Sequence, residues 1–425
     1  MINIYDTPAR SEWAALTRRQ LPDDSVVEQR VAEILERVRK DGDAALKAIA
    51  TEIEGSCPEN FLVSPSEMDA AEAVVPAGLK EAISRAAANI RAFHAAQTAE
   101  TVKVETMPGV RCERRSLPIA RVGLYIPGGS APLFSTLLML AIPAKIAGCR
   151  EIVLCTPCGR DGKVADAVLY AARFCGVDKI FKIGGAQAVA AMAYGTESVP
   201  KVLKIFGPGN RYVTKAKQLV SAAGTAIDMP AGPSEVMVMA DSTANPAYVA
   251  ADLLSQCEHG PDSQALLVCD CMDIAKAVDA ETERQLALLP RASIAEKSLA
   301  NSRVIVLDGR EAMIDFANCY AAEHLIISMD DPWAVADRIE AAGSVFIGNH
   351  SPESAGDYAS GTNHTLPTMG LAGAFSGIGT DSFRHQVTYQ ELSREGLSSL
   401  AETIITMADA EGLDAHAAAV KVRTR

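Results

Sequence analysis

The stretch Val122-Gly123-Leu124-Tyr125-Ile126-Pro127-Gly128-Gly129 carries the clearest structural signal in this 425-residue chain. An apolar run that stops at Pro-Gly-Gly is typical of a buried strand leading into a helix. The pattern recurs downstream, with strands predicted at 152–155, 180–183, 202–206 and 235–240 and helical periodicity between them. This alternation predicts a parallel sheet with helices on both faces.

A second set of strands follows residue 240. These strands are predicted at 265–269, 304–307, 325–327 and 345–347. The chain before residue 100 has mostly helical periodicity, and an amphipathic helix is predicted at 392–407. Residues 348–379 are rich in Gly, Ser, Asn and Pro, and a loop of that length inside a compact chain is usually functional. We therefore predict a two-unit α/β protein.

The composition limits the classes of partner. Hydrophobic residues make up 48% of the chain and charged residues 22%, which is typical of a globular protein. A net charge of −13 argues against a nucleic-acid or anionic-membrane partner, because the basic footprint is missing. The N-terminal residues contain no apolar signal segment, and the most apolar run, 131–148, contains Pro143 and Lys145 and is too short to span a bilayer. We expect a cytoplasmic protein.

The ten cysteines are scattered, mostly inside apolar runs. Cys155 and Cys158 are the exception, because they follow a predicted strand as a redox dithiol does. A zinc site would need a second pair at suitable spacing, and the sequence contains none. A structural role is therefore the favoured interpretation of this pair.

Three glycine-rich turns fall at the predicted carboxyl edge of the first sheet. They are Pro127-Gly128-Gly129-Ser130, Gly184-Gly185-Ala186-Gln187 and Gly207-Pro208-Gly209-Asn210. Ligands of open parallel sheets bind at this edge, and the amides of a following helix can receive phosphate. None of the turns is the G-x-G-x-x-G fingerprint, and each alone is equally consistent with a tight turn. Together they favour a nucleotide ligand.

Gln256 and His259 lie three residues apart at the end of a helical pattern, so their side chains point the same way. An amide oxygen and an imidazole at such a position can hold zinc, but taken alone the pair favours a helix end whose histidine interacts with the last carbonyls. Glu323 and His324 directly precede a predicted strand. An imidazole there can act as a general base and the carboxylate can activate water, or the pair can be a cap and a packed histidine.

Asp357 and His416 would complete a mixed nitrogen and oxygen ligand set with Gln256 and His259. Nothing in the spacing of these four residues shows that they meet. The residues alone therefore predict a two-unit α/β enzyme with a nucleotide ligand and an unresolved metal site.

Several segments, taken in order, resemble the histidinol dehydrogenase family from about Val26 to the C-terminus. They are Val122-Gly-Leu-Tyr-Ile-Pro-Gly-Gly-Ser-Ala-Pro, Gly184-Gly-Ala-Gln, Phe206-Gly-Pro-Gly-Asn, Asp228-Met-Pro-Ala-Gly-Pro-Ser-Glu, Leu253-Leu-Ser-Gln, Glu258-His-Gly-Pro-Asp-Ser-Gln, Ala322-Glu-His-Leu and Ser354-Ala-Gly-Asp-Tyr-Ala-Ser-Gly-Thr-Asn-His. The resemblance implies two incomplete Rossmann-like parallel-sheet units with a helical N-terminal segment and a C-terminal helical tail. It also implies a zinc-containing homodimer that oxidises L-histidinol to L-histidine through the aldehyde with two NAD+, the final steps of histidine biosynthesis.

The resemblance assigns a role to each matching residue. The zinc ligands would be Gln256, His259, Asp357 and His416. His324 would take the proton as hydride leaves, and Glu323 would activate the water that hydrates the aldehyde. Substrate would also be contacted by Ser234, His364 and Glu411, and NAD by Tyr125, Gln187 and Asn210. Cys257 lies between two ligands, where a thiol could compete for the metal.

The predicted division has four parts. They are an N-terminal arm (1–22), a larger α/β domain with the metal and catalytic residues (23–121 plus 241–380), a Rossmann-like nucleotide-binding domain (122–240) and a dimer-forming helical tail (381–425). The segment that carries Glu411 and His416 is too small to form a domain, so it must dock on something. Exchange across a two-fold axis is one solution, in which the tail completes the partner's active site, and docking on its own sheet is the other.

Three rival functions remain. A relative that oxidises another small polar alcohol, such as a sulfonated propanediol, would share the fold and differ around Ser234, His364 and Glu411, which here match the histidinol pattern. A two-lobed binding protein leaves Glu323 and His324 unexplained. A zinc hydrolase would need an H-E-x-x-H helix, which the sequence lacks, and has no use for three glycine turns.

Overall fold

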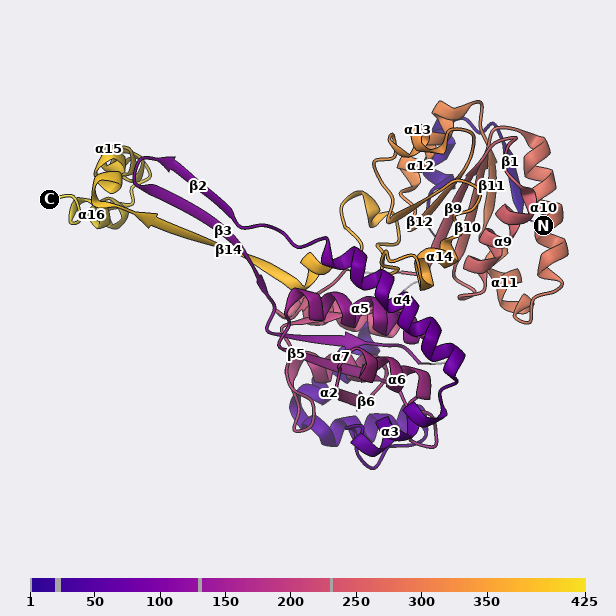
Figure 1. The fold of residues 1–425 in the computed structure, drawn as a ribbon, viewed down its shortest axis with the longest axis horizontal. Helices are drawn as coiled ribbons and strands as arrows, with labels where there is room; N and C mark the ends of the chain where they lie inside the picture. The colour runs from indigo at the N-terminus through magenta and orange to yellow at the C-terminus, as the bar shows by residue number, and fades with distance from the viewer. Residues whose placement is uncertain (1, 20–23, 129–131, 230–231) are drawn as a thin grey trace.

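The structure, a computed structural model, describes residues 2–19, 24–128, 132–229 and 232–425. Two α/β lobes lie against each other, and a long arm projects from the lobe that contains β5 and β6 (Figure 1). The two parallel sheets and the C-terminal helices confirm the predicted fold class. No helix within the described residues is long and apolar enough to cross a membrane.

The smaller lobe is built on a parallel sheet with strand order β6-β5-β4-β7-β8. Its strands are β4 (Arg121–Tyr125), β5 (Glu151–Thr156), β6 (Lys179–Lys182), β7 (Lys204–Phe206) and β8 (Ala226–Ile227). Its covering helices are α5 (Phe134–Ala147), α6 (Asp166–Phe174), α7 (Gly185–Tyr194) and α8 (Arg211–Ala222). The central strands β4 and β5 are buried on both faces, which is why their sequences read as nearly continuous apolar runs.

The N-terminal helices cover this smaller lobe. They are α2 (Ser25–Ile49), the π-helical turn η2 (Ala50–Glu54), α3 (Pro65–Val74) and α4 (Ala77–Ala95). The apolar stripe of α2, including Val31 and Leu35, packs in one cluster with Val189 of α7. The predicted division instead places residues 23–121 with the larger domain. Helical periodicity identifies the buried face of a helix but does not say which sheet receives it.

The larger lobe is built on a parallel sheet with strand order β1-β11-β10-β9-β12-β13. Its strands are β1 (Asn3–Asp6), β9 (Glu235–Ala240), β10 (Gln264–Cys269), β11 (Arg303–Val306), β12 (His324–Ser328) and β13 (Ser344–Ile347). The helices around it are α9 (Pro246–Cys257), α10 (Met272–Leu286), α11 (Ala292–Leu299), α12 (Arg310–Tyr320) and α13 (Pro332–Ala336). Strand β9, assigned to the nucleotide domain in the predicted division, therefore lies inside the other sheet.

The predicted N-terminal arm is not a free polar segment over its described part. β1 is an edge strand paired with β11, and a short helix α1 (Trp13–Leu16) buries Trp13 and Leu16. The indole of Trp13 packs edge-on against Phe316 with ring centroids 5.2 Å apart. The segment is held to the lobe despite its polar composition, because burial removes most of the surface of Trp13 and Leu16 from water. Residues 1 and 20–22 of this prediction lie outside the described residues.

The projecting arm consists of an antiparallel sheet with strand order β14-β3-β2 and two terminal helices (Figure 1). Its strands are β2 (Val102–Met107), β3 (Val110–Pro118) and β14 (Arg384–Leu392), and its helices are α15 (Arg394–Ala410) and α16 (Asp414–Lys421). The helix predicted at 392–407 corresponds to α15. The three strands were not predicted, because most of their residues are exposed on both faces and so lack an apolar pattern.

The predicted long loop, 348–379, joins the two lobes. It contains α14 (Glu353–Tyr358) and the 3₁₀ turn η3 (Leu371–Gly373), and the 3₁₀ turn η4 (Thr380–Phe383) follows it. Asn363 Nδ2 donates to the Met139 carbonyl of α5 at 2.6 Å, and Thr380 Oγ1 donates to the His94 carbonyl of α4 at 2.7 Å. These buried hydrogen bonds fix the loop against the smaller lobe.

The turn after β7 depends on a glycine. Gly207 has φ +124°, and a Cβ there would lie 2.1 Å from the Tyr125 carbonyl oxygen. We expect Gly207→Ala to lower the melting temperature by clearly more than Gly224→Ala, a position with φ +101° but no atom within 4 Å of the added carbon. Gly224→Ala carries only backbone strain of about 1–3 kcal/mol. Thermal melting followed by circular dichroism measures both shifts, and equal shifts would show that the turn relaxes freely.

Candidate functional site

Glu323 and His324 lie at the amino-terminal end of β12, beside the start of β9, and both are buried. The Glu323 carboxylate accepts a hydrogen bond from the Glu235 N–H at 2.8 Å. His324 Nδ1 lies 3.2 Å from the Glu235 carbonyl oxygen, which can only accept. The proton of a neutral His324 ring is therefore on Nδ1, and Nε2 carries the lone pair.

The free ring nitrogen faces a carboxylate. His324 Nε2 lies 3.4 Å from Asp357 Oδ1, while no group in the described part of the chain forms a hydrogen bond with Nε2. Neighbouring strand residues normally point to opposite faces of a sheet. Because Glu323 and His324 stand at the mouth of the strand, both instead reach the first residue of β9. This placement leaves Nε2 of His324 facing Asp357 beside the start of β9.

A cluster of metal-ligating groups lies beside this pair. One ligand atom each from His259, Glu353 and Asp357 lies within 4.8 Å of the others, a spacing that can hold a metal ion. The amide of Gln256 presents one atom to Glu353, at 3.0 and 3.1 Å from its carboxylate oxygens. If this atom is nitrogen it donates to Glu353, and if it is oxygen it joins the other ligands of a cation. The structure thus gathers three predicted ligands and adds Glu353, which was not predicted.

The electrostatics of the cluster favour a cation. Burial raises the pKa of Glu323 and that of Glu353 each to about 8. Burial lowers the pKa of His324, but the carboxylates of Glu323 and Asp357 outweigh it and raise the pKa to about 10. Burial raises the pKa of Asp357, yet contact with His324 holds it below its usual range. Buried carboxylates in this number hold protons or positive charge, so a divalent ion fits the donor set.

His364 lies beside the cluster. His364 Nδ1 lies 2.8 Å from the Asp357 carbonyl oxygen and its Nε2 lies 3.2 Å from Thr136 Oγ1, so both ring nitrogens have partners. A substrate atom that binds His364 must therefore displace or share the Thr136 hydroxyl. Ser234 directly precedes Glu235 and is partly exposed at the start of β9.

Glu411 and His416 do not join the other predicted residues within one chain. Glu411 follows α15, His416 is on α16, and both side chains are exposed. These helices form the far end of the arm, while α9 and α14 are in the larger lobe (Figure 1). The intramolecular site therefore lacks both residues.

The carboxyl edge of the smaller sheet carries the predicted nucleotide contacts. The Tyr125 hydroxyl at the end of β4 accepts from the Gly185 N–H at 3.0 Å, and burial raises the pKa of Tyr125 to about 12. Gln187 Nε2 donates to Glu54 Oε1 at 3.2 Å, and the Asn210 side chain caps α8 by accepting from the N–H of Tyr212 at 3.0 Å. Gly129 and Ser130 of the first glycine turn lie outside the described residues.

The carboxyl edge of the smaller sheet lies next to the site residues of the larger lobe. Thr136 belongs to the first turn of α5, which follows the carboxyl end of β4, and it contacts His364 beside Asp357. The carboxyl edge of the smaller sheet is thereby placed next to the amino edge of the larger sheet. A ligand on the first edge can reach a group held by the second.

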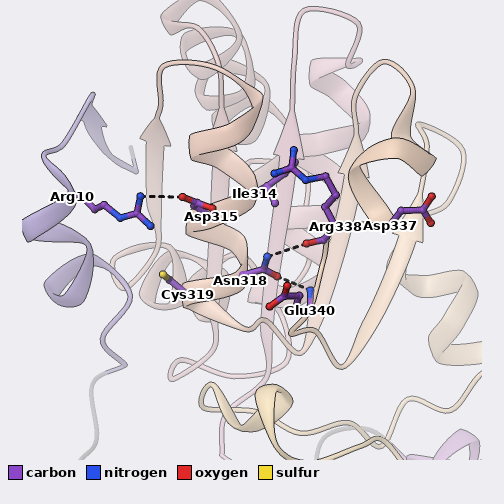
Figure 2. A pocket seen from close by; sticks show the side chains of 8 residues that line it. All are labelled: Arg10, Ile314, Asp315, Asn318, Cys319, Asp337, Arg338 and Glu340. Atoms are coloured by element: carbon purple, nitrogen blue, oxygen red, sulfur yellow. Dashed lines mark hydrogen bonds and ion pairs between the residues drawn. The ribbon is translucent and has the colours of Figure 1, made fainter.

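A separate hollow of about 510 Å³ lies on the larger lobe (Figure 2). Its lining residues are Arg10, Ile314, Asp315, Asn318, Cys319, Asp337, Arg338 and Glu340. Arg10 pairs with Asp315 at 3.0 Å, and Asn318 Nδ2 donates to the Arg338 carbonyl. None of the predicted site residues lines this hollow.

The cysteine pair of the sequence analysis forms no disulfide: Cys155 is buried, Cys158 is half-buried, and both are free thiols.

The fold and the site define a two-lobed α/β protein with a buried glutamate–histidine pair beside a cluster of groups that could hold a metal ion. The profile of the family described as "Histidinol dehydrogenase" matches residues 17–424. The chain is 56% identical to a histidinol dehydrogenase of Bacteroides fragilis (strain YCH46) over 99% of both chains, and 52% identical to that of Xylella fastidiosa over 99% of this chain and 97% of the relative. The chain belongs to the histidinol dehydrogenase family.

A solved structure agrees over nearly the whole length. The crystal structure of histidinol dehydrogenase from Elizabethkingia anophelis matches with a TM-score of 0.97 and 48% identity, covering 99% of this chain and 98% of that one. The match therefore includes both lobes and the arm.

Removal of one carboxylate tests the metal-ligating cluster. We expect Asp357→Ala to weaken Zn²⁺ binding about 100-fold and to abolish turnover, because a ligand and the charge facing His324 are lost together. Competition with a chromophoric chelator measures the affinity. Far-UV circular dichroism should stay unchanged, since each lobe has its own core. Glu258→Ala, on the same turn as His259 but outside the cluster, is the control. Global unfolding of the metal-free protein would show the metal to be structural instead.

Proposed function

We propose that this protein is an NAD-dependent, zinc-containing histidinol dehydrogenase that oxidises L-histidinol to L-histidine through L-histidinaldehyde in the cytoplasm. The observation that carries the proposal is the buried pair Glu323 and His324 beside the metal-ligating cluster, in a chain of this family. The alternative is an enzyme of this family that oxidises a different small polar alcohol. It is not favoured, because the relatives at 56% and 55% identity are named histidinol dehydrogenase.

The proposed metal is one Zn²⁺ per subunit. Gln256, His259 and Asp357 would hold it, with the fourth ligand, His416, supplied by the partner subunit. Support comes from the donor set, since imidazole, carboxylate and amide oxygen all suit zinc. When bound, zinc orients the substrate and neutralises the carboxylates around it.

His324 would remove the alcohol proton. Its Nδ1–H is held toward the Glu235 carbonyl, so Nε2 of the neutral ring can accept the hydroxyl proton while hydride passes from the carbinol carbon to NAD+. Burial lowers the pKa of this ring less than the carboxylates around it raise it, and a bound cation would offset those carboxylates and favour the neutral form. The products of this step are the aldehyde, NADH and one proton. His364, Ser234 and Glu411 would hold the substrate, with Glu411 coming from the partner subunit.

Glu323 would serve the second oxidation. Burial raises the pKa of this carboxyl to about 8, so its ionised form is a stronger base than a free carboxylate and can take a proton from water. The water adds to the aldehyde carbon to give the hydrate. A second hydride transfer to another NAD+ then yields the carboxylate, so each L-histidinol consumes two NAD+ and one water.

The smaller lobe would bind NAD at its carboxyl edge, where Tyr125, Gln187 and Asn210 lie close to the glycine turns. The larger lobe would carry the acid–base and metal residues. Bound there, the nicotinamide would face the substrate across the contact between Thr136 and His364.

One assay tests the proposed function. The purified protein should form NADH, followed by its absorbance, when supplied with NAD+ and L-histidinol, and two NADH should appear per histidinol. Treatment with a chelator should remove the activity and added Zn²⁺ should restore it. Activity with a sulfonated propanediol but not with histidinol would establish the rival substrate.

The two half-reactions separate the two proposed bases. We expect Glu323→Gln to slow oxidation of L-histidinaldehyde by about 10²- to 10⁴-fold while oxidation of the alcohol falls much less, because only the second step needs activated water. His324→Ala should slow both steps. Single-turnover assays started from each substrate measure the two rates. Equal losses in both half-reactions for Glu323→Gln would remove the proposed role.

Complementation tests the proposed exchange of tails in a homodimer. His324→Ala and His416→Ala, each inactive alone, are unfolded together and refolded as a mixture. If the tail acts in the partner, a mixed dimer contains one site with an intact His324 and an intact His416 of the partner subunit, and about half of the mixed dimers' sites work. A mixture as inactive as its parents, with mixed dimers shown to be present, would mean that each tail closes its own site.

A further inference from the structure

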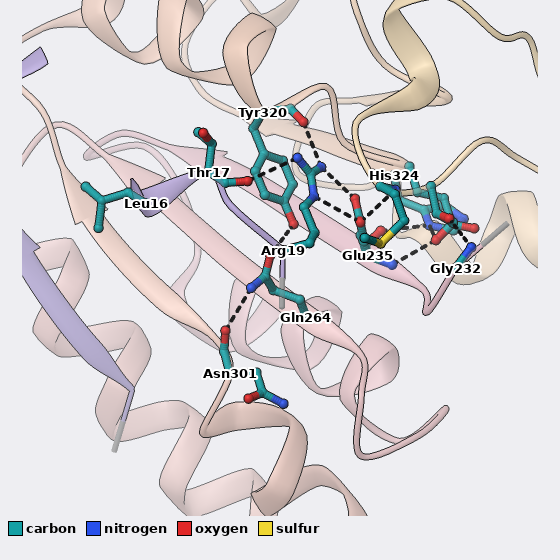
Figure 3. Close-up of polar contacts among 12 residues, drawn as sticks. Leu16, Thr17, Arg19, Gly232, Glu235, Gln264, Asn301, Tyr320 and His324 are labelled. Carbon is teal, nitrogen blue, oxygen red and sulfur yellow. Dashed lines mark hydrogen bonds and ion pairs between the residues drawn. The ribbon is translucent and has the colours of Figure 1, made fainter. Parts of the chain in front are cut away.

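The backbone of Glu235 holds both proposed bases at once. Its N–H donates to Glu323 Oε2 at 2.8 Å, and its carbonyl oxygen lies 3.2 Å from His324 Nδ1 (Figure 3). A shift of this one residue would move the carboxylate and change which nitrogen of His324 carries the proton. The position of Glu235 is therefore critical for both side chains.

The side chain of Glu235 is itself held by Arg19, which comes from the N-terminal segment. Arg19 Nε donates to Glu235 Oε1 at 3.0 Å and Nη2 to Oε2 at 2.7 Å, a two-point contact of planar groups. The Met369 N–H, from the long loop, also donates to Oε1 at 2.8 Å. The side-chain exposure of Arg19 and Glu235 is 11% and 2%, so water competes little for these bonds.

Arg19 is in turn fixed on three sides (Figure 3). Its guanidinium stacks 3.6 Å from the ring centroid of Tyr320 and donates to the carbonyls of Tyr320 and Thr17 at 2.7 and 3.2 Å. The Tyr320 hydroxyl donates to Gln264 Oε1 at 2.7 Å. These contacts leave Arg19 one position, so the carboxylate that it binds also has one position.

We propose that Arg19 and Glu235 form a positioning clamp that sets the orientation of Glu323 and the tautomer of His324 for the oxidation described above. The proposal rests on the proposed function for its readout. Neither residue touches the reacting atoms, and both act through the Glu235 peptide groups. A purely structural ion pair would stabilise the N-terminal segment without affecting the rate of turnover.

Kinetics of matched variants separate these two roles. Arg19→Gln should lower kcat about 10- to 100-fold, the cost typical of losing an orienting contact, with KM for histidinol within about threefold. Arg19→Lys keeps the charge but loses the planar two-point contact, so its kcat should be intermediate. Arg10→Gln removes an exposed ion pair of the same segment and should leave kcat unchanged. Rates are expressed per bound metal ion.

A charge-neutral double variant controls for stability. Arg19→Met with Glu235→Gln removes the ion pair without leaving a buried charge unpaired, so its melting temperature should lie near that of the parent. The clamp predicts that its kcat nevertheless stays low. Recovery of both stability and kcat in this variant would overturn the proposal, as would a kcat of Arg19→Gln within twofold of the parent. If Arg19→Gln does not fold, the double variant and Arg19→Lys decide.

A double-mutant comparison and a structure complete the test. In a His324→Ala background, Arg19→Gln should have little further effect on the remaining rate of alcohol oxidation, because the group that it positions for that step is gone. Crystal structures of the parent and Arg19→Gln should show that the contacts of Glu235 with Glu323 and His324 lengthen or break. Unchanged contacts in Arg19→Gln would overturn the clamp, whether or not the parent oxidises histidinol. A parent that has these contacts but does not oxidise histidinol would contradict only the proposed function.

Discussion

Several carboxyl groups are kept out of water at one point between the lobes, and the rest of the site depends on how each is compensated. Glu235 is paired with Arg19, Glu323 accepts from a backbone N–H, and Asp357 faces His324. Glu353 accepts from Ser255 and lies against the Gln256 amide. A buried charge is tolerated only when partners replace water. The negative charge that remains around His259 and Asp357 makes this the natural position for a cation.

The lobes bring together two sheet edges of opposite kind. The smaller sheet offers its carboxyl edge, where the proposed nucleotide site lies and where the Gly185 N–H donates to the Tyr125 hydroxyl and Asn210 caps α8. The larger sheet offers its amino edge, where Glu235 and His324 begin adjacent strands. Buried contacts from His364 and Asn363 to α5 hold these edges together. The proposed cofactor on one edge and the proposed base on the other would give the arrangement that hydride transfer requires.

The sequence predicted those parts of the fold that are buried from both sides. Strands of the two parallel sheets read as apolar runs. The candidates Glu323, His324, Gln256, His259 and Asp357 lie near one another in the structure, while their roles stay predictions. Glu353, Arg19 and Glu235 were not identified, because their roles arise from contacts between distant segments, such as the 216 residues that separate Arg19 from Glu235. No local spacing encodes such a contact. The family resemblance, and not periodicity, supplied the roles of the individual residues.

The burial of the arm is incomplete within a single chain. Its strands are largely exposed on both faces, and α15 buries only Gly396 and Ala408, while Met407, Leu413 and Val422 are exposed. An isolated sheet of this kind gains little from burying apolar surface, so its stability needs a second surface. Folding back would require the long strands β3 and β14 to bend, whereas a second copy could receive the arm as it stands. The same argument explains why Glu411 and His416 are separated from the other predicted residues: the proposed exchange needs them at the far end of the arm.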